Sequence, residues 1–124
     1  AALVRERGTE ALLKTPPQWL RKASPHWDAL LAAIRRQPAE AIAQASIAMA
    51  KRPDSRADLA TIDVPTAVVV GEEDTITPPD MSRAMSDAIP GATLSIIPNA
   101  GHLANLEAPV TFETAVRAWL RRAT

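Results

Sequence analysis

The sequence of 124 residues contains no cysteine. Disulfide bonds, thiolate zinc sites and a cysteine nucleophile are therefore excluded. An excess of charge is also absent, because fourteen basic and fourteen acidic side chains cancel, and nothing global indicates binding to nucleic acid or to an anionic membrane. No apolar run approaches the ~20 residues of a membrane-spanning helix. The composition that remains, 47% hydrophobic and 23% charged, is typical of a globular protein, which we expect in the cytoplasm.

The first 53 residues have a helical pattern, in which Ala, Leu, Ile and Arg dominate and β-branched residues are few. We expect three helices, over residues 1–14, from Ser24-Pro25 onward, and over residues 38–49. Thr15-Pro16-Pro17 ends the first helix, and Ser24 caps the second. The chain opens abruptly, as if from the middle of a protein. A polar break at residues 51–55 predicts a boundary between residues 53 and 54.

Residues 54–124 follow a different pattern, in which short β-branched runs alternate with helices. The apolar runs at residues 66–70 and 93–97 predict strands of a parallel sheet. Pro78-Pro79-Asp80 predicts the start of a helix, with Asp80 as its cap and Met81, Met85, Ala88 and Ile89 on one stripe. A last helix begins near Pro109, with Phe112, Val116, Trp119 and Leu120 facing inward. The order strand, helix, strand, helix predicts a βαβ unit of the α/β class.

This predicted sheet is incomplete, because two parallel strands are not stable by themselves. Residues 66–70 are too apolar for an open edge, so further strands are expected from another chain or from a preceding segment. An unpaired strand edge also favours self-association into a homo-oligomer.

An acidic residue and a histidine follow the two predicted strands. Asp74 comes after residues 66–70, and His102 comes after residues 93–97. The carboxyl ends of neighbouring parallel strands lie about 4.8 Å apart at one edge of a sheet, so their loops can bring a carboxylate to an imidazole. The carboxylate then fixes the tautomer of the ring, and the other ring nitrogen can act as a general base.

At these residues the chain resembles the α/β-hydrolase family. Val64-Pro65 through Gly71-Glu72-Glu73-Asp74 to Pro78 is similar to the family's acid strand and loop. Ile89-Pro90-Gly91-Ala92, Asn99-Ala100-Gly101-His102 and Glu107-Ala108-Pro109 are similar to its histidine segment, and Phe112 to Leu120 to its final helix. The resemblance implies that Asp74 is the triad acid and His102 the triad base. It also implies that residues 1–53 are a helical lid and residues 54–124 the carboxyl-terminal part of a doubly wound, mostly parallel sheet.

One part of the family pattern is missing from this sequence. The nucleophile of the fold lies in a Gly-x-Ser-x-Gly elbow and precedes the acid and the histidine in the chain. None of the four glycines flanks a serine in that pattern, and the oxyanion-hole loop, which precedes the elbow, is missing as well. We therefore expect the amino-terminal half of the hydrolase as a partner, and little activity from this chain without it.

The resemblance implies hydrolysis of an ester, a lactone or a related bond in a small molecule, with no metal or organic cofactor. Ile76 and Leu103, beside the two catalytic candidates, could line the substrate pocket, and ordinary core packing is an equal alternative. Carbon–carbon hydrolysis, dehalogenation and perhydrolysis use the same fold and stay open. A different alternative is a non-enzymatic module that binds a partner through its open strand edge.

Several residues have a plainer interpretation beside the functional one. Asp74 could be a turn residue and His102 a core histidine, and Glu72 or Glu73 could substitute as the acid. The far-apart His26 and His102 have no metal-site spacing. Trp19, Trp27 and Met49 could face substrate, although helix packing is favoured. Glu107 is expected to favour the start of the last helix through its charge.

Overall fold

The computed structural model describes residues 1–13 and 18–123 of the chain. These residues form two compact units. The first unit contains Pro25–Asp54 and the described residues of Ala1–Pro17, and the second contains Gln18–Ser24 and the described residues of Ser55–Thr124. The segment Gln18–Ser24 therefore belongs with the second unit, although it stands between two stretches of the first in the sequence. The sequence pattern did not predict this assignment.

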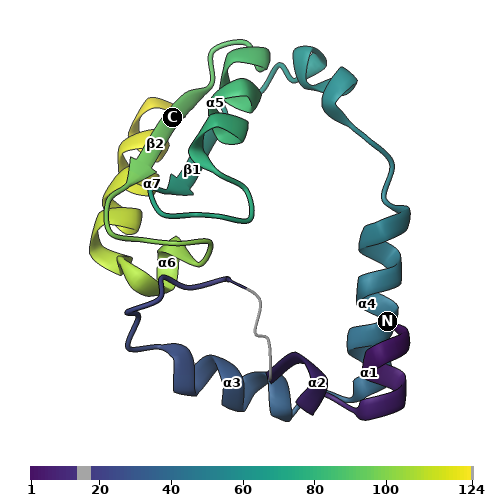
Figure 1. Ribbon diagram of the computed structural model, residues 1–124. Helices are drawn as coiled ribbons and strands as arrows, with labels where there is room; N and C mark the ends of the chain where they lie inside the picture. Colours follow the sequence, from purple (N-terminus) through teal and green to yellow (C-terminus); the bar gives the residue numbers. More distant parts are fainter. Residues whose placement is uncertain (14–17, 124) are drawn as a thin grey trace. The chain divides into compact units, whose positions relative to one another are not determined.

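The described part of the first unit is helical, as its composition predicts. Its helices are α1 (Ala2–Arg7), α2 (Glu10–Leu13), α3 (Trp27–Arg35) and α4 (Ala39–Lys51) (Figure 1). Val4, Ile34 and Ala43 are the buried apolar side chains of these helices. They stand on three different helices, and their burial holds the helices against one another.

Two predictions for this unit are wrong in their details. The expected helix over residues 1–14 is two helices, because Gly8, with φ of 69°, ends α1 in a backbone conformation that glycine favours. Lys14 and the expected break at Thr15-Pro16-Pro17 lie outside the described residues. The second helix begins at Trp27 and not at Ser24-Pro25, because Ser24 is buried and donates its N–H to the Arg21 carbonyl in a turn.

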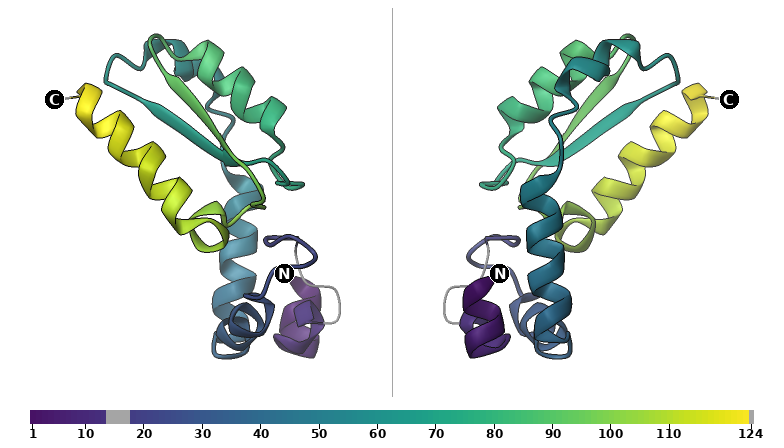
Figure 2. Two further views of the ribbon diagram at one scale, coloured as in Figure 1. Left: turned by 90° about the vertical axis from the view of Figure 1, so that its left-hand side faces the viewer. Right: turned by 90° about the vertical axis from the view of Figure 1, so that its right-hand side faces the viewer.

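The second unit contains a parallel two-stranded sheet with a helix on each face. Strand β1 (Ala67–Gly71) pairs with β2 (Thr93–Ile97), from Ala67 opposite Thr93 to Gly71 opposite Ile97. Helix α5 (Pro79–Ala88) connects the strands, and α7 (Pro109–Ala123) packs on the opposite side of the sheet from α5 (Figure 2). The predicted α/β order is confirmed. A 3₁₀ helix at Arg56–Thr61 and the short α6 (Ala104–Glu107) were not predicted.

The core of this unit lies between the sheet and α7. Ile97, Ala100 and Ala104 are buried there, and Phe112 and Ala115 of α7 pack against them. Burial of a side chain such as Ile97, which is 2% exposed, contributes about 2–3 kcal/mol. Phe112 faces inward as predicted, whereas Leu120 is 47% exposed. Leu120 lies eight residues after Phe112, so its side chain is rotated by about 80° around the helix axis relative to that of Phe112. Leu120 therefore points away from the sheet.

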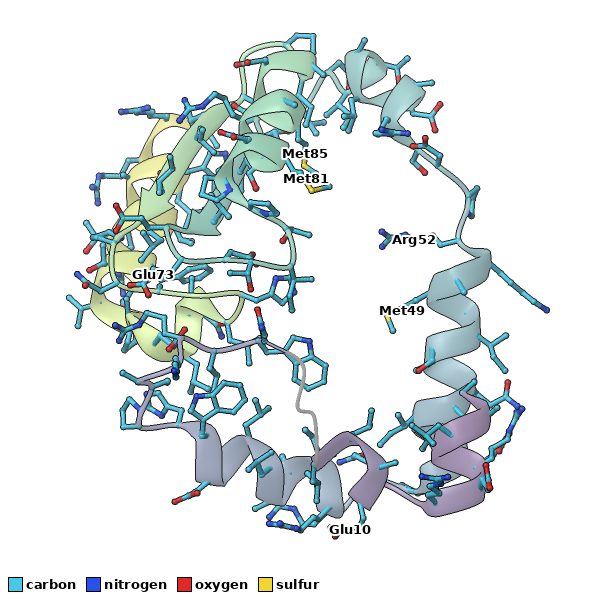
Figure 3. The ribbon with its side chains drawn as sticks, in the orientation of Figure 1. Glu10, Met49, Arg52, Glu73, Met81 and Met85 are labelled. Atoms are coloured by element: carbon cyan, nitrogen blue, oxygen red, sulfur yellow. The ribbon has the colours of Figure 1, made fainter. Side chains whose placement is uncertain are left out.

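Helix α5 differs from its prediction in its cap and its exposed face. Pro78 occupies the N-cap position and no side chain caps the helix, because Pro79 takes the first helical position and Asp80 falls inside the first turn. Met81 and Met85 are 58% and 44% exposed, and they project from α5 beside each other (Figure 3). Ile89, which follows the helix, is buried. Among the described residues no helix is long and apolar enough to span a membrane.

Candidate functional site

The loops that follow β1 and β2 are joined through their backbones. Glu72 donates its N–H to the Ile97 carbonyl at 2.8 Å, and Glu73 donates its N–H to the Ala100 carbonyl at 2.8 Å. A Cβ on Gly71 would overlap the carbonyl oxygens of Ala100 and Gly101. Glycine at the end of β1 therefore allows the two loops to approach this closely, and this approach places the residues after each strand side by side.

Asp74 is buried, with 5% of its surface exposed, and it is fixed by its own loop. Its Oδ1 accepts hydrogen bonds from the N–H groups of Ile76 at 2.9 Å and Thr77 at 3.0 Å. Its Oδ2 accepts a hydrogen bond from the Thr77 hydroxyl at 2.8 Å. The loop thus folds back around the carboxylate, which is the turn that an aspartate favours when its side chain bonds the backbone two or three residues ahead.

The structure brings His102 to this carboxylate, as the order of strands predicts. Nδ1 of His102 lies 2.9 Å from Oδ2 of Asp74, and the two side chains are 35% and 4% exposed. The Thr77 hydroxyl lies 3.2 Å from the same ring nitrogen. Its single proton goes to Asp74, so toward the ring the hydroxyl oxygen accepts. Two acceptors therefore face Nδ1, which favours a proton on Nδ1 and leaves Nε2 of the neutral ring unprotonated.

The electrostatics of Asp74 agree with an ionised acid. Burial by itself would raise the pKa of Asp74, but hydrogen bonds from the Thr77 amide, the His102 ring, the Thr77 hydroxyl and the Ile76 amide together hold that pKa below its usual value. The carboxylate is therefore charged at neutral pH. A charged carboxylate against one ring nitrogen stabilises the protonated imidazole that a general base becomes after it takes a proton.

Thr77 was not predicted as a site residue. It contacts both Asp74 and His102, and so it belongs to the same hydrogen-bonded group. A local signal was present in the sequence, because a threonine three residues after an aspartate matches the turns in which Asp and Thr side chains bond one another and the nearby backbone.

Glu107 makes contacts that the sequence did not predict. It was expected to favour the start of the last helix through its charge, and the structure adds that its side chain, which is 0% exposed, accepts backbone N–H groups of the histidine loop and of Arg21. Oε2 of Glu107 accepts the N–H of Gly101 at 2.7 Å. These direct N–H donors compensate for the burial of the carboxylate.

The other candidates lie around the Asp74–His102 pair. Ile76 is 41% exposed, and Leu103 is half-buried and donates its N–H to the Trp19 carbonyl at 3.0 Å. Glu73, in the loop after β1, lies 3.8 Å from the Arg21 guanidinium (Figure 3). Glu72 accepts the N–H of Asn99 at 3.4 Å. Both glutamates thus have partners other than His102.

The aromatic and methionine candidates of the helical part differ in exposure. Trp19 and Trp27 are half-buried. Met49 on α4 is 68% exposed, so the favoured prediction that it packs between helices is wrong for the described residues (Figure 3). Across residues 1–13 and 18–123, no three His, Asp or Glu side chains gather as metal ligands would.

Comparison with known families agrees with this geometry. A model described as the alpha/beta hydrolase family matches residues 1–115. The chain belongs to the α/β-hydrolase family. Its resemblance to that family, first indicated by the acid and histidine segments, is thereby confirmed, and the fold class with it.

Relatives of known structure in this family cover nearly the whole chain. A thermophilic esterase from Thermogutta terrifontis is 34% identical, with a TM-score of 0.83 over 97% of this chain and 46% of the esterase. An enol-lactonase from Burkholderia xenovorans LB400 is 28% identical, with a TM-score of 0.82 over 97% of this chain and 48% of that enzyme.

Comparison of sequences gives a similar coverage for an enol-lactonase. The 3-oxoadipate enol-lactonase 2 of Acinetobacter baylyi is 28% identical over an alignment of 128 positions, which covers 98% of this chain and 47% of the lactonase. The chain spans about half the length, or less, of the relatives that it matches.

Proposed function

We propose that Asp74 and His102 are the acid and the base of a catalytic triad that hydrolyses an ester, a lactone or a related bond. The proposal rests on the 2.9 Å contact between the buried, ionised carboxylate of Asp74 and the partly exposed imidazole of His102, at the carboxyl edge of a parallel sheet. The similarity to an esterase and to enol-lactonases supports acyl chemistry. Ligands of open parallel sheets bind at this edge.

The proposed chemistry assigns one role to each of the two side chains. Nε2 of His102 takes the proton of a hydroxyl nucleophile while the oxygen attacks the carbonyl carbon of the substrate. The protonated ring, held by Asp74, then gives that proton to the leaving oxygen as the bond to it breaks. Water, deprotonated by the same nitrogen, then attacks the acyl carbon. The bond to the oxygen of the nucleophile breaks, that oxygen takes the proton back from Nε2, and the site returns to its first state.

The nucleophile in this proposal comes from a segment outside the 124 residues. The sequence contains no Gly-x-Ser-x-Gly elbow, and its relatives are about twice as long. We call the chain together with such a segment, joined or bound, the completed hydrolase. Within it, residues 1–53 serve as the lid, and Ile76 and Leu103 border the substrate. The chain without the segment is expected to be inactive, and its cytoplasmic location stays a prediction.

The test combines native mass spectrometry with hydrolysis of a chromogenic short-chain ester, both on the same purified sample. We expect hydrolysis only in samples whose mass exceeds the 13.3 kDa of this chain by a nucleophile-bearing segment. Hydrolysis by the 13.3 kDa chain alone would show that its nucleophile lies within these residues. A completed hydrolase that leaves esters and lactones intact would overturn the proposed reaction.

A further inference from the structure

Glu107 is a buried carboxylate that the proposed reaction does not use. Its side chain is 0% exposed, although an isolated charge in such a place is costly. Burial by itself would raise the pKa of Glu107, but hydrogen bonds from the Gly101 amide, the Ser24 hydroxyl and the Arg21 amide, together with the Arg21 charge, lower that pKa below its usual value. The carboxylate is therefore ionised, and the donors around it compensate for its burial.

The donors to Glu107 come from two segments that are far apart in the sequence. Gly101, in the histidine loop, donates its N–H to Oε2 at 2.7 Å. Arg21 donates its N–H to both carboxylate oxygens, at 3.1 and 3.2 Å, and its Nε lies 3.5 Å from Oε1. A second link joins the same segments, because Leu103 donates its N–H to the Trp19 carbonyl. Residues 19–24 are thereby fastened to the loop on both sides of His102.

The contact with Gly101 bears directly on the orientation of His102. The N–H that Glu107 holds belongs to the residue immediately before His102, so it helps to fix the backbone from which the imidazole projects. A Cβ on Gly101 would lie 3.0 Å from Oε2 of Glu107 and 3.1 Å from the Arg21 nitrogen, so the carboxylate fits closely against this residue. Displacement of a reacting group by about 1 Å can lower a rate about 100-fold.

We propose that Glu107 is a positioning residue for His102, which holds the Gly101 amide and couples residues 19–24 to the histidine loop. This inference rests on the proposed function, because the position of the imidazole affects the rate only if His102 is the catalytic base. Glu107 does not touch the reacting atoms. Its effect passes through one peptide group and reaches the ring of His102, whose Nδ1 must stay within hydrogen-bond distance of Asp74.

The experiment compares Glu107→Gln with Glu113→Gln in the completed hydrolase. Glutamine keeps the size of the side chain but replaces one carboxylate oxygen by an amide nitrogen, which donates and cannot accept. The donors from Gly101, Arg21 and Ser24 must then share a single acceptor oxygen. Glu113 on α7 is exposed and pairs with Arg117, so it provides the same substitution away from the loop. We expect kcat to fall about 10- to 100-fold in Glu107→Gln with KM changed less than about threefold, and neither constant to change in Glu113→Gln.

A spectroscopic measurement separates positioning from a general loss of stability. In ¹⁵N-labelled protein whose spectrum shows that it is folded, Glu107→Gln should move the Gly101 amide resonance and reduce the share of His102 rings protonated at Nδ1. Ser24→Ala, which removes one donor and leaves the carboxylate in place, should shift both signals in the same direction by a smaller amount. This milder variant keeps the test valid if Glu107→Gln does not fold.

The outcomes distinguish this inference from the proposed function. If His102→Ala abolishes hydrolysis while Glu107→Gln and Ser24→Ala match wild type in kcat and in the His102 spectrum, Glu107 does not position His102 and the triad stands. If His102→Ala leaves hydrolysis intact, the proposed function fails. The spectra of Gly101 and His102 then still report whether Glu107 fixes the loop.

Discussion

Both units of the chain contain ionised carboxylates with a lowered pKa, but these carboxylates are bound in different ways. On the helices of the first unit, hydrogen bonds from Arg5 and then Gln44 lower the pKa of Glu40 to about 2, and both ends of the Arg5–Glu40 ion pair are exposed. In the second unit, Asp74 and Glu107 are buried and accept backbone N–H groups.

The two kinds of carboxylate differ in how strongly they determine the conformation of the backbone around them. An exposed ion pair between two long side chains contributes little, because water competes for both partners and salt screens them. A buried carboxylate that accepts backbone N–H groups fixes the loop that supplies them, and removing it leaves those donors unsatisfied. The second unit therefore uses its charges to set the geometry of loops, and we expect substitutions there to have the larger effects.

The largest effect on stability is expected from Gly71→Ala. The added Cβ would overlap backbone oxygens of Ala100 and Gly101, which cannot move aside as a flexible side chain can. We expect a loss of about 3 kcal/mol, the upper end for overpacking. Gly91→Ala is the control, since Gly91 has φ of +71° but open space at its Cβ, and a loss of about 1–2 kcal/mol is expected. Equal losses in urea unfolding would contradict the role of close loop approach.

A smaller effect is expected from Thr77→Val, which removes the hydroxyl but keeps the shape of the side chain. Asp74 loses one of its donors, and a hydrogen bond to a charged group contributes about 1.5–3 kcal/mol. Because the backbone N–H of Thr77 still donates, we expect a loss near the lower limit of that range. Thr61→Val, at an exposed hydroxyl that donates to the Asp58 carbonyl, should change the urea midpoint much less. A Thr77 variant as stable as wild type would argue against a fixed carboxylate.

Acid should weaken the second unit through Asp74 and Glu107. Both folded-state pKa values are lowered, so the stability that these groups add is complete above their usual values of 3.8 and 4.5. As the pH falls through those values, the unfolded chain binds more protons than the folded one, and the stability decreases. The loss is complete once the pH is below the folded-state pKa values. Urea midpoints measured between pH 7 and pH 3 should fall, and Glu107→Gln should make the fall less steep. A slope unchanged by that substitution would contradict the assignment.

The smallest effect is expected from Glu40→Gln in the first unit. The ion pair with Arg5 is exposed, so hydrogen exchange of α1 and α4 should be nearly the same in wild type and variant at physiological salt. Clear loss of protection in these helices, persisting in 0.5 M salt, would show that exposed pairs matter as much as buried ones here and would remove the contrast between the units.

Local patterns predicted much of the fold of the second unit. Strand β2 has the predicted bounds, and β1 is displaced by one residue, with Gly71 inside the strand and Thr66 outside it. β-branched runs that end in glycine or proline carry this information locally. Asp74 and His102 were predicted because each follows a strand, and the carboxyl ends of parallel strands share one edge.

Contacts between distant residues could not be predicted in the same way. Glu107 and Arg21 are 86 residues apart, and nothing near either residue indicates the other. Ser24-Pro25 carries a strong local signal for a helix start, but the burial of Ser24 and its hydrogen bond to Glu107 override that signal. Thr77 is an intermediate case, because its relation to Asp74 is local and its contact with His102 depends on the sheet.

The proposed hydrolysis depends most on the pairing of Asp74 with His102 as an acid–base pair, and the rate of ester hydrolysis by the completed hydrolase tests this pairing most directly. We predict that Asp74→Asn lowers kcat by about 10⁴-fold and His102→Ala by at least as much, as expected for the loss of a triad member, while Glu113→Gln keeps the wild-type rate. Wild-type rates in both Asp74→Asn and His102→Ala would contradict the account, and the chemistry would then have to lie elsewhere in the protein.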